Sequence, residues 1–156
     1  MAENQKQFEI GYRIIKIHSI KFNFEDYNEG IIEKLFNTKD SLGLNINTSL
    51  KIDKETSVIT IDIATKLVKN KEDKTIISHT GRTAYHIKGL DKIYNKETDS
   101  FDLPDDFTIQ LYSLSYTHAR ALLSTELSPT NYRDKYFLPV INPSHFIKND
   151  KLNKPK

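Results

Sequence analysis

Cysteine is absent from the 156 residues of this chain. Its absence excludes disulfide bonds, thiolate zinc sites and a cysteine nucleophile. A domain of this length buries about 68–70% of the surface that its unfolded chain exposes, so a core can form without a metal or a covalent cross-link. We therefore expect one domain, and its composition is compatible with a reducing compartment.

Long apolar runs are also absent. No run in the sequence approaches the roughly 18–20 apolar residues that a membrane-spanning helix needs. The first residues of the chain, 1–6, do not have the composition of a signal peptide. We expect a cytoplasmic protein that does not insert into a membrane.

The charge of the chain is close to balanced, with 23 basic and 21 acidic residues and a formal net charge of +2. A strongly basic domain is the usual electrostatic signature of nucleic-acid binding, so this balance predicts no nucleic-acid partner. The last residues, 148–156, contain four lysines and one aspartate. We expect them to form a disordered basic tail after a single domain that spans residues 1–147.

Motifs that carry catalysis or bind cofactors are missing as well. No two of the five histidines lie four residues apart, which is the spacing of a helical metal pair. The five glycines are scattered and form no phosphate-binding loop, and no serine lies in a Gly-x-Ser-x-Gly context. The cluster of Glu25, Asp26 and Glu29 is explained better by a charged loop than by an acid/base pair. We expect no enzymatic activity, no cofactor and no metal.

Four segments have the alternation of polar and apolar residues that is typical of half-buried strands. They span residues 8–24, 44–52, 59–67 and 76–87. In the first segment the alternation changes phase between Ile14 and Ile15, which predicts a bulge or two strands joined by a bend. Gly81 lies inside the fourth segment and predicts a bulge or the close approach of another backbone.

The connection between the first two strands, residues 25–43, is too long for a hairpin turn and is rich in apolar residues. Connections of this length commonly have a function or contain a short helix of their own. Residues 31–36 suit such a helix. The apolar side chains of this crossover are Tyr27, Ile31, Ile32, Leu35, Phe36 and Leu42.

Residues 107–127 have the three-and-four spacing of a helix with one apolar face. The side chains on that face are Ile109, Tyr112, Tyr116, Ala119 and Leu123. Asp105 and Asp106 are expected to cap the helix, although polar and apolar residues alternate in its first turn, which leaves an extended conformation open there. Further on, Asn142 and Pro143 suit the cap and the first turn of a short final helix.

Strands followed by helices are typical of the α+β class. We predict a four-stranded antiparallel sheet with a long crossover between its first two strands, packed on one long C-terminal helix and a short final helix. This arrangement cannot easily cover all the aromatic side chains of the crossover and of residues 132–138. Part of this apolar surface is therefore expected to contact a partner subunit, a ligand or both.

Four segments, in this order along the chain, are similar to motifs of one known family. Residues 12–25 end in Phe-Asn-Phe-Glu, and residues 81–91 contain Tyr-His-Ile-Lys-Gly-Leu. Residues 119–123 read Ala-Arg-Ala-Leu-Leu, with Ala121 where the family usually has glycine, and residues 138–143 read Leu-Pro-Val-Ile-Asn-Pro. In this order they resemble the first strand, the fourth strand, the late part of the first long helix and the Pro-Val hinge of the SecB export chaperones, including their relatives associated with toxin–antitoxin systems.

The resemblance implies a homotetramer, a dimer of dimers, that holds unfolded polypeptides in long apolar grooves between the crossover, the sheet and the main helix. Such holding needs neither ATP nor a cofactor, because burying apolar surface releases roughly 25 cal/mol per Å². Well-known export members are acidic, and some dock the motor ATPase SecA through acidic sheet faces and tails. This chain is slightly basic, which argues against SecA as a partner and favours a specialised member with a dedicated client, such as an antitoxin.

The resemblance also indicates which residues contact clients and partner subunits. The expected client-binding residues lie in the crossover and in the loop after the long helix, and they are Tyr27, Ile31, Ile32, Leu35, Phe36, Leu42, Tyr132, Tyr136 and Phe137. A subunit interface or the core is expected for Tyr112, Tyr116 and Leu123, and a structural or interface ion pair for Arg120. Local packing on the sheet is the alternative for the client-binding set, and the two can hold for different residues.

Two other functions are compatible with the same features. A small-ligand-binding module would use the apolar crossover as a lid over one enclosed pocket. A structural adaptor would use the aromatic side chains to bind one permanent partner. The oligomeric state helps to separate these hypotheses, because a chaperone of this kind is expected to be a tetramer and a ligand-binding module a monomer or a dimer.

Overall fold

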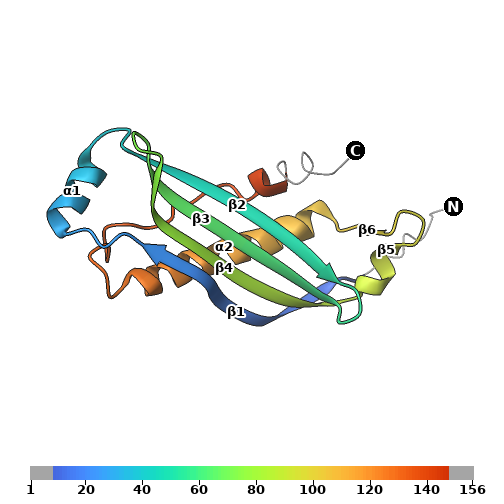
Figure 1. Ribbon diagram of the computed structural model, residues 1–156. Helices are drawn as coiled ribbons and strands as arrows, with labels where there is room; N and C mark the ends of the chain where they lie inside the picture. Colours follow the sequence, from blue (N-terminus) through green and yellow to red (C-terminus); the bar gives the residue numbers. More distant parts are fainter. Residues whose placement is uncertain (1–8, 148–156) are drawn as a thin grey trace.

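The computed structural model describes residues 9–147, which form four long strands, two helices and the start of a short final helix (Figure 1). In chain order the long elements are β1 (Gly11–Phe24), α1 (Glu29–Asn37), β2 (Leu42–Asp53), β3 (Val58–Lys69), β4 (Lys74–Lys88) and α2 (Asp105–Leu127). Between β4 and α2 lie the short helix η1 (Leu90–Ile93) and a hairpin of β5 (Tyr94–Asn95) and β6 (Ser100–Phe101). The final helix includes residues 144–147. The expected tail, residues 148–156, lies outside the described residues.

The four long strands form one antiparallel sheet in the order β1-β4-β3-β2. Helix α2 lies along one face of the sheet and passes behind it in Figure 1. The predicted α+β architecture is therefore confirmed. Strands β1 and β2 form opposite edges, so the crossover that contains α1 passes around one end of the sheet from one edge to the other.

Strand β1 contains two bulges. Its pairing with β4 shifts register at Ile15 and again at Ile20, and neither residue has a partner in β4. The predicted phase change is therefore a bulge and not a bend between two strands. The bulges keep Tyr12 and Phe22 on the face that α2 covers, where both side chains pack against the core.

The core lies between α2 and the sheet. It contains Ile59, Ile61, Ile63, Tyr85 and Ile87 from the sheet and Leu111, Tyr112, Tyr116, Ala119 and Leu123 from α2. The Tyr85 hydroxyl lies 2.8 Å from the Oγ of Ser115 and donates to the carbonyl of Leu111 at 3.2 Å. Burial raises the pKa of Tyr85 to about 12, so its hydroxyl keeps its proton at neutral pH and links β4 to α2.

The ends of the helices differ in how well the sequence predicts them. The N-cap of α2 is Pro104, which has no side-chain hydrogen bond to offer, and Asp105 and Asp106 lie inside the first turn. The expectation that these two residues cap the helix is therefore wrong, although their charge suits that end. The first turn is helical, not extended. Asn142 caps the final helix as predicted, because its Oδ1 accepts hydrogen bonds from the N–H and the hydroxyl of Ser144.

Helix α2, the longest helix among the described residues, carries several serine and threonine residues along its length. Among residues 9–147, no helix combines the length and the apolar character that crossing a membrane requires.

Gly81 in β4 allows α2 to approach the sheet closely. A Cβ atom placed on Gly81 would lie 3.1 Å from both the Cα and the Cβ of Ala119. The predicted close approach of another backbone is therefore confirmed.

We expect Gly81→Val to lower the free energy of unfolding by about 1–3 kcal/mol, because the added carbons must push α2 away from the sheet. Gly11→Val is the matched control in β1, where an added Cβ would have its nearest neighbour at 3.9 Å. We expect the control to change the free energy by less than about 0.5 kcal/mol. Urea denaturation measures both variants, and equal losses would contradict the role given to Gly81.

Candidate functional site

Helix α1 lies at the centre of the crossover and has one buried and one exposed side. Its N-cap is Asn28, whose Oδ1 accepts a hydrogen bond from the N–H of Ile31 at 3.0 Å. Ile32 is 0% exposed, whereas its neighbour Ile31 is 44% exposed. The short helix predicted in the crossover is confirmed, and its orientation separates these two adjacent residues into core and surface.

The loop after α2 is bonded to the crossover. The hydroxyl of Tyr132 donates to the carbonyl of Glu25 at 2.7 Å, and the Nδ2 of Asn131 donates to the carbonyl of Tyr27 at 3.0 Å. Burial raises the pKa of Tyr132 to about 12, so this donor keeps its proton at neutral pH. The crossover and the loop, far apart in sequence, therefore form one continuous surface at the α1 end of the molecule.

The same loop is also fixed to α2. The hydroxyl of Tyr116 donates to the carbonyl of Pro139 at 2.6 Å, and the Nε of Arg120 donates to the carbonyl of Leu138 at 3.0 Å. Arg120 was expected to form an ion pair, but the partner that the structure gives it is a backbone carbonyl. Because two side chains of α2 hold consecutive carbonyls, the segment at residues 138–139 follows the helix closely.

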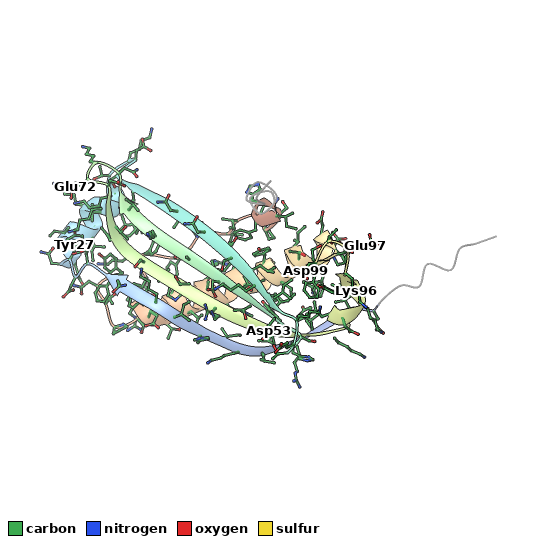
Figure 2. All side chains as sticks on the ribbon, turned by 45° about the vertical axis from the view of Figure 1, so that its right-hand side comes forward. Tyr27, Asp53, Glu72, Lys96, Glu97 and Asp99 are labelled. Carbon is green, nitrogen blue, oxygen red and sulfur yellow. The ribbon has the colours of Figure 1, made fainter. Side chains whose placement is uncertain are left out.

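Tyr27 lies in the crossover just before α1, between two lysines. The Nζ atoms of Lys69 and Lys74 are 5.9 Å and 5.8 Å from the centroid of its ring. The pKa of Lys74 is raised first by the Tyr27 side chain and then by Glu25, which lies 3.6 Å from its Nζ. Figure 2 shows Tyr27 at the end of the molecule that carries α1.

Burial divides the nine expected client-binding residues into three groups. Ile32, Tyr132 and Tyr136 are buried, and Tyr27, Leu35, Phe36 and Leu42 are half-buried, while Ile31 and Phe137 are exposed. The ring of Phe36 packs on that of Tyr136, with centroids 6.0 Å apart. Local packing therefore accounts for the buried group, and the exposed group is available to another molecule.

The residues expected at a subunit interface or in the core are largely enclosed by their own chain. Tyr112, Tyr116 and Leu123 are buried between α2 and its neighbours, and the rings of both tyrosines pack on Phe146. Burial raises the pKa of Tyr116. The fold of a single chain accounts for the burial of all three without a partner subunit.

A recess of about 430 Å³, named here the α1 recess, lies between α1 and the turn that joins β3 to β4. Its lining includes Ile31, Lys34, Leu35, Lys69, Lys71 and Glu72. Ile31 and Leu35 supply its apolar surface. Lys69 and Glu72 form an ion pair at 2.8 Å, and the hydrogen bond from Lys69 lowers the pKa of Glu72. Figure 2 shows Glu72 and Tyr27 at this same end of the molecule.

A second recess of about 480 Å³, the α2 recess, lies between the last turns of α2 and the loop that follows. Leu127, Tyr136 and Phe137 contribute to its lining, and Phe137 is 58% exposed. Val140, further along the loop, is 81% exposed. Val140 belongs to the Pro-Val segment of the sequence motif, and no pattern in the sequence indicated its exposure.

The edge of β1 carries a further apolar surface that was not assigned a role from the sequence. Its members, between 39% and 48% exposed, are Ile14, Ile15, Ile17, Ile20 and Phe24. An edge strand also presents backbone N–H and C=O groups that no neighbouring strand pairs. The phase change in this segment was the available signal, because both bulged residues, Ile15 and Ile20, belong to this set.

No arrangement suited to metal binding is found among residues 9–147, where no group of three or more histidine and carboxylate side chains is placed to hold an ion. Two histidines have polar partners instead. The Nε2 of His79 lies 2.8 Å from the hydroxyl of Ser19, and the Nδ1 of His118 lies 3.0 Å from the hydroxyl of Thr83. Burial lowers the pKa of both imidazoles, so the neutral form of each is favoured in the folded protein.

Comparisons with known proteins give matches only among solved structures. No family model matches the chain, and no curated protein does. A SecB-like chaperone of Mycobacterium tuberculosis, Rv1957, in complex with a ChAD peptide from the Rv1956 HigA1 antitoxin, aligns with a TM-score of 0.49 and 12% identity over 84% of this chain and 86% of that chain. A protein of unknown function from Streptococcus agalactiae aligns with a TM-score of 0.43 and 14% identity over 85% of this chain and 98% of that chain.

We expect Tyr132→Phe to lower the free energy of unfolding by about 1 kcal/mol, because the buried bond to the Glu25 carbonyl is lost. The amides of α1 are expected to exchange hydrogen faster in this variant, because the loop no longer holds the crossover. Tyr12→Phe is the matched control. It also removes a tyrosine hydroxyl, which accepts an exposed hydrogen bond from the Nε2 of Gln110 at 2.9 Å. Native-state hydrogen exchange measures the effect, and unchanged exchange in α1 would contradict the coupling.

Proposed function

We propose that this protein is an ATP-independent holdase chaperone that binds unfolded or non-native polypeptides at the α1 end of the molecule. The observation that carries the proposal is the exposed apolar surface of Ile31 and Phe137 beside two recesses. These side chains belong to the crossover and to the loop bonded to it, which are the two segments that the resemblance to SecB chaperones assigns to client binding.

The shape of the surface favours an extended chain over a compact ligand. The α1 recess and the α2 recess are both open to solvent, and neither is an enclosed pocket of the kind that surrounds a small molecule. Phe36 and Tyr136 pack between the crossover and the loop, so apolar side chains continue from one segment to the other. An unfolded polypeptide can place successive apolar side chains in such a series of sites.

The energy source of this binding is the burial of apolar surface alone. At roughly 25 cal/mol per Å², an extended client gains affinity in proportion to the apolar area it covers, without nucleotide or cofactor. Binding to unfolded but not to native clients also keeps them from folding. The proposal includes a cytoplasmic location and a dedicated client, such as an antitoxin, and it does not include docking to SecA.

The proposed assembly is a homotetramer in which the β1 edge makes one of the subunit contacts. Exposed isoleucines along an unpaired edge strand favour association over a monomeric state, because both the apolar side chains and the backbone groups are left without partners. Ile15 and Ile17 are 48% and 42% exposed on this strand, which makes them the most exposed of its apolar side chains.

For the assembly, we expect the double variant Ile15→Lys with Ile17→Lys to have a lower molecular mass than the unmodified protein. Lysine at both positions places charge at the edge that a partner would cover. Val140→Lys is the control, since Val140 is exposed far from β1 in the sequence and in a different segment. Light scattering coupled to size-exclusion chromatography measures the mass. A monomeric unmodified protein would contradict the assembly.

For client binding, we expect the unmodified protein to suppress aggregation of a denatured model protein without ATP, at fewer tetramers than clients. The double variant Ile31→Asp with Phe137→Asp is expected to lose affinity for a denatured client by about tenfold or more, because two apolar contacts are removed. Its free energy of unfolding should change by less than about 0.5 kcal/mol, since both side chains are exposed.

The matched control is Asn37→Asp with Thr117→Asp, which adds the same charge at two exposed polar positions of α1 and α2. We expect the control to keep its affinity for the client. Equal losses in both double variants would show that charge, and not the apolar surface, governs binding. No suppression by the unmodified protein, together with a monomeric mass, would end the chaperone proposal.

A further inference from the structure

The face of the sheet that α2 does not cover is a second extended surface. Directly paired residues of an antiparallel sheet share a face. Ile61 of β3 pairs with Leu50 of β2 and Thr83 of β4 on the α2 side, so the alternate residues, beginning with Asp62, lie on the other side. Figure 1 shows α2 passing behind the sheet, and no described element crosses the near side.

The uncovered face carries far more positive than negative charge. By the cross-strand pairing, its basic residues are Arg13, Lys16, Lys21, Lys51, Lys66, Arg82 and Lys88. The carboxylates that the same pairing places there are those of Asp53 and Asp62. The whole chain has a formal net charge of only +2, so the excess of basic over acidic residues on this surface is larger than that of the whole chain, and we name it the basic face.

Most of these cations have no internal partner. Arg82 is the exception, because its Nε and Nη2 donate to the two carboxylate oxygens of Asp62 at 2.7 Å each. No salt bridge within residues 9–147 includes the other six. The Oδ1 of Asp53 accepts hydrogen bonds from the backbone N–H groups of residues 55 and 56, and this bonding holds its carboxylate in the turn at the end of the sheet.

The acidic residues of the turns lie at the two ends of the basic face. In Figure 2, Glu72 lies at one end of the molecule, and Asp53, Glu97 and Asp99 lie at the other. The positive charge between the two ends is therefore not compensated by neighbouring turns. An anionic partner that lies along the sheet meets cations over most of its length.

The shape of the basic face suits an elongated partner. Small side chains lie in its middle, on β3 and β4, and they are Thr60, Ala64, Ser78, Thr80 and Ala84. Lys16 lies on edge strand β1 and Lys51 on edge strand β2. These two strands are three strand spacings, or about 14 Å, apart. An α-helix is about 10–12 Å wide with its side chains, so one helix fits between the two edges.

The chemistry of the face favours a polypeptide over a nucleic acid. Single-stranded nucleic acids bind through aromatic side chains on which the bases stack, and the pairing places no phenylalanine, tyrosine or tryptophan on this face. Asparagine, serine and threonine side chains on β2, β3 and β4 offer hydrogen bonds instead. Carboxylates on a helix would meet lysines at the edges and these polar groups between them.

We propose that the basic face docks an acidic helical segment of a partner protein. This function is additional to the holdase activity and independent of it, because the face lies on the uncovered side of the sheet and the client surface lies at the α1 end. Client and partner can therefore bind at the same time.

The test uses a labelled glutamate-rich helical peptide as the probe and measures its affinity by fluorescence anisotropy. The variant Lys16→Gln with Lys51→Gln and Lys66→Gln removes one cation from each of three strands. We expect the affinity of this triple variant to fall about tenfold, because each exposed ion pair contributes modestly and three are lost. Lys34→Gln with Lys39→Gln and Lys71→Gln is the control at the α1 end, and we expect it to lose less than about twofold.

Several results would overturn the proposal. Equal losses in the two triple variants would show binding by total charge, and a larger loss in the control would assign the peptide to the α1 recess. Absence of binding by the unmodified protein at physiological ionic strength, or tighter binding of single- or double-stranded nucleic acid of matched length, would also contradict it.

Mapping of amide chemical shifts in the unmodified protein gives a check that does not depend on any variant. Shifts on peptide addition are expected at Asn47, Ala64 and Thr80, and shifts confined to α1 would overturn the proposal. Suppression of aggregation is expected to be the same in the face variant and the unmodified protein. Because holding and docking are measured separately, failure of one proposal is distinguishable from failure of the other.

Discussion

Contact between α2 and the sheet determines most of the remaining structure. The backbone of α2 comes so close at Ala119 that a Cβ atom at Gly81 would lie 3.1 Å from it, and the buried hydroxyl of Tyr85 links β4 to Ser115 of the helix. Among residues 9–147, α2 is the long element that packs on the sheet. Within residues 9–147, one face and both edge strands therefore stay open, and the surfaces on which function is proposed are those that α2 leaves uncovered.

The segments beyond α2 depend on the same helix. Tyr116 and Arg120 hold the carbonyls of residues 138 and 139, and Tyr132 then holds the crossover through the Glu25 carbonyl. A chain of bonds thus runs from the core helix through the loop to α1. This arrangement explains why apolar side chains remain exposed at the α1 end, since polar bonds to the backbone, and not burial of every apolar group, fix the loop and the crossover in place.

Alternation in the sequence was enough to predict the sheet, because β2 has one half-buried face, β3 has one buried face, and strand side chains alternate with a period of two. The phase change at Ile15 and the cap at Asn142 were also readable, since each depends on neighbouring residues only. Ile31 and Ile32 could not be separated in this way, because the rotation of α1 against the loop decides which one is buried. Asp105 and Asp106 were assigned as caps from their chemistry. The helix begins at Asp105, however, so the capping position is that of Pro104.

Charge is the property for which sequence and structure differ most. A count over the whole chain gives near balance, but strand pairing brings Lys16, Lys51 and Lys66 to one face from three separate strands, while many carboxylates lie in turns. The registers of the four strands decide which charged residues share a face, and no local pattern reveals it.

The two proposed binding surfaces therefore use different interactions, apolar contact at the α1 end and charge at the basic face. Apolar contact is nearly independent of salt, whereas contact between exposed charges is screened within about 8 Å at physiological ionic strength. Binding at the α1 end and binding at the basic face should therefore respond to salt in different ways, which allows the two to be separated in one protein.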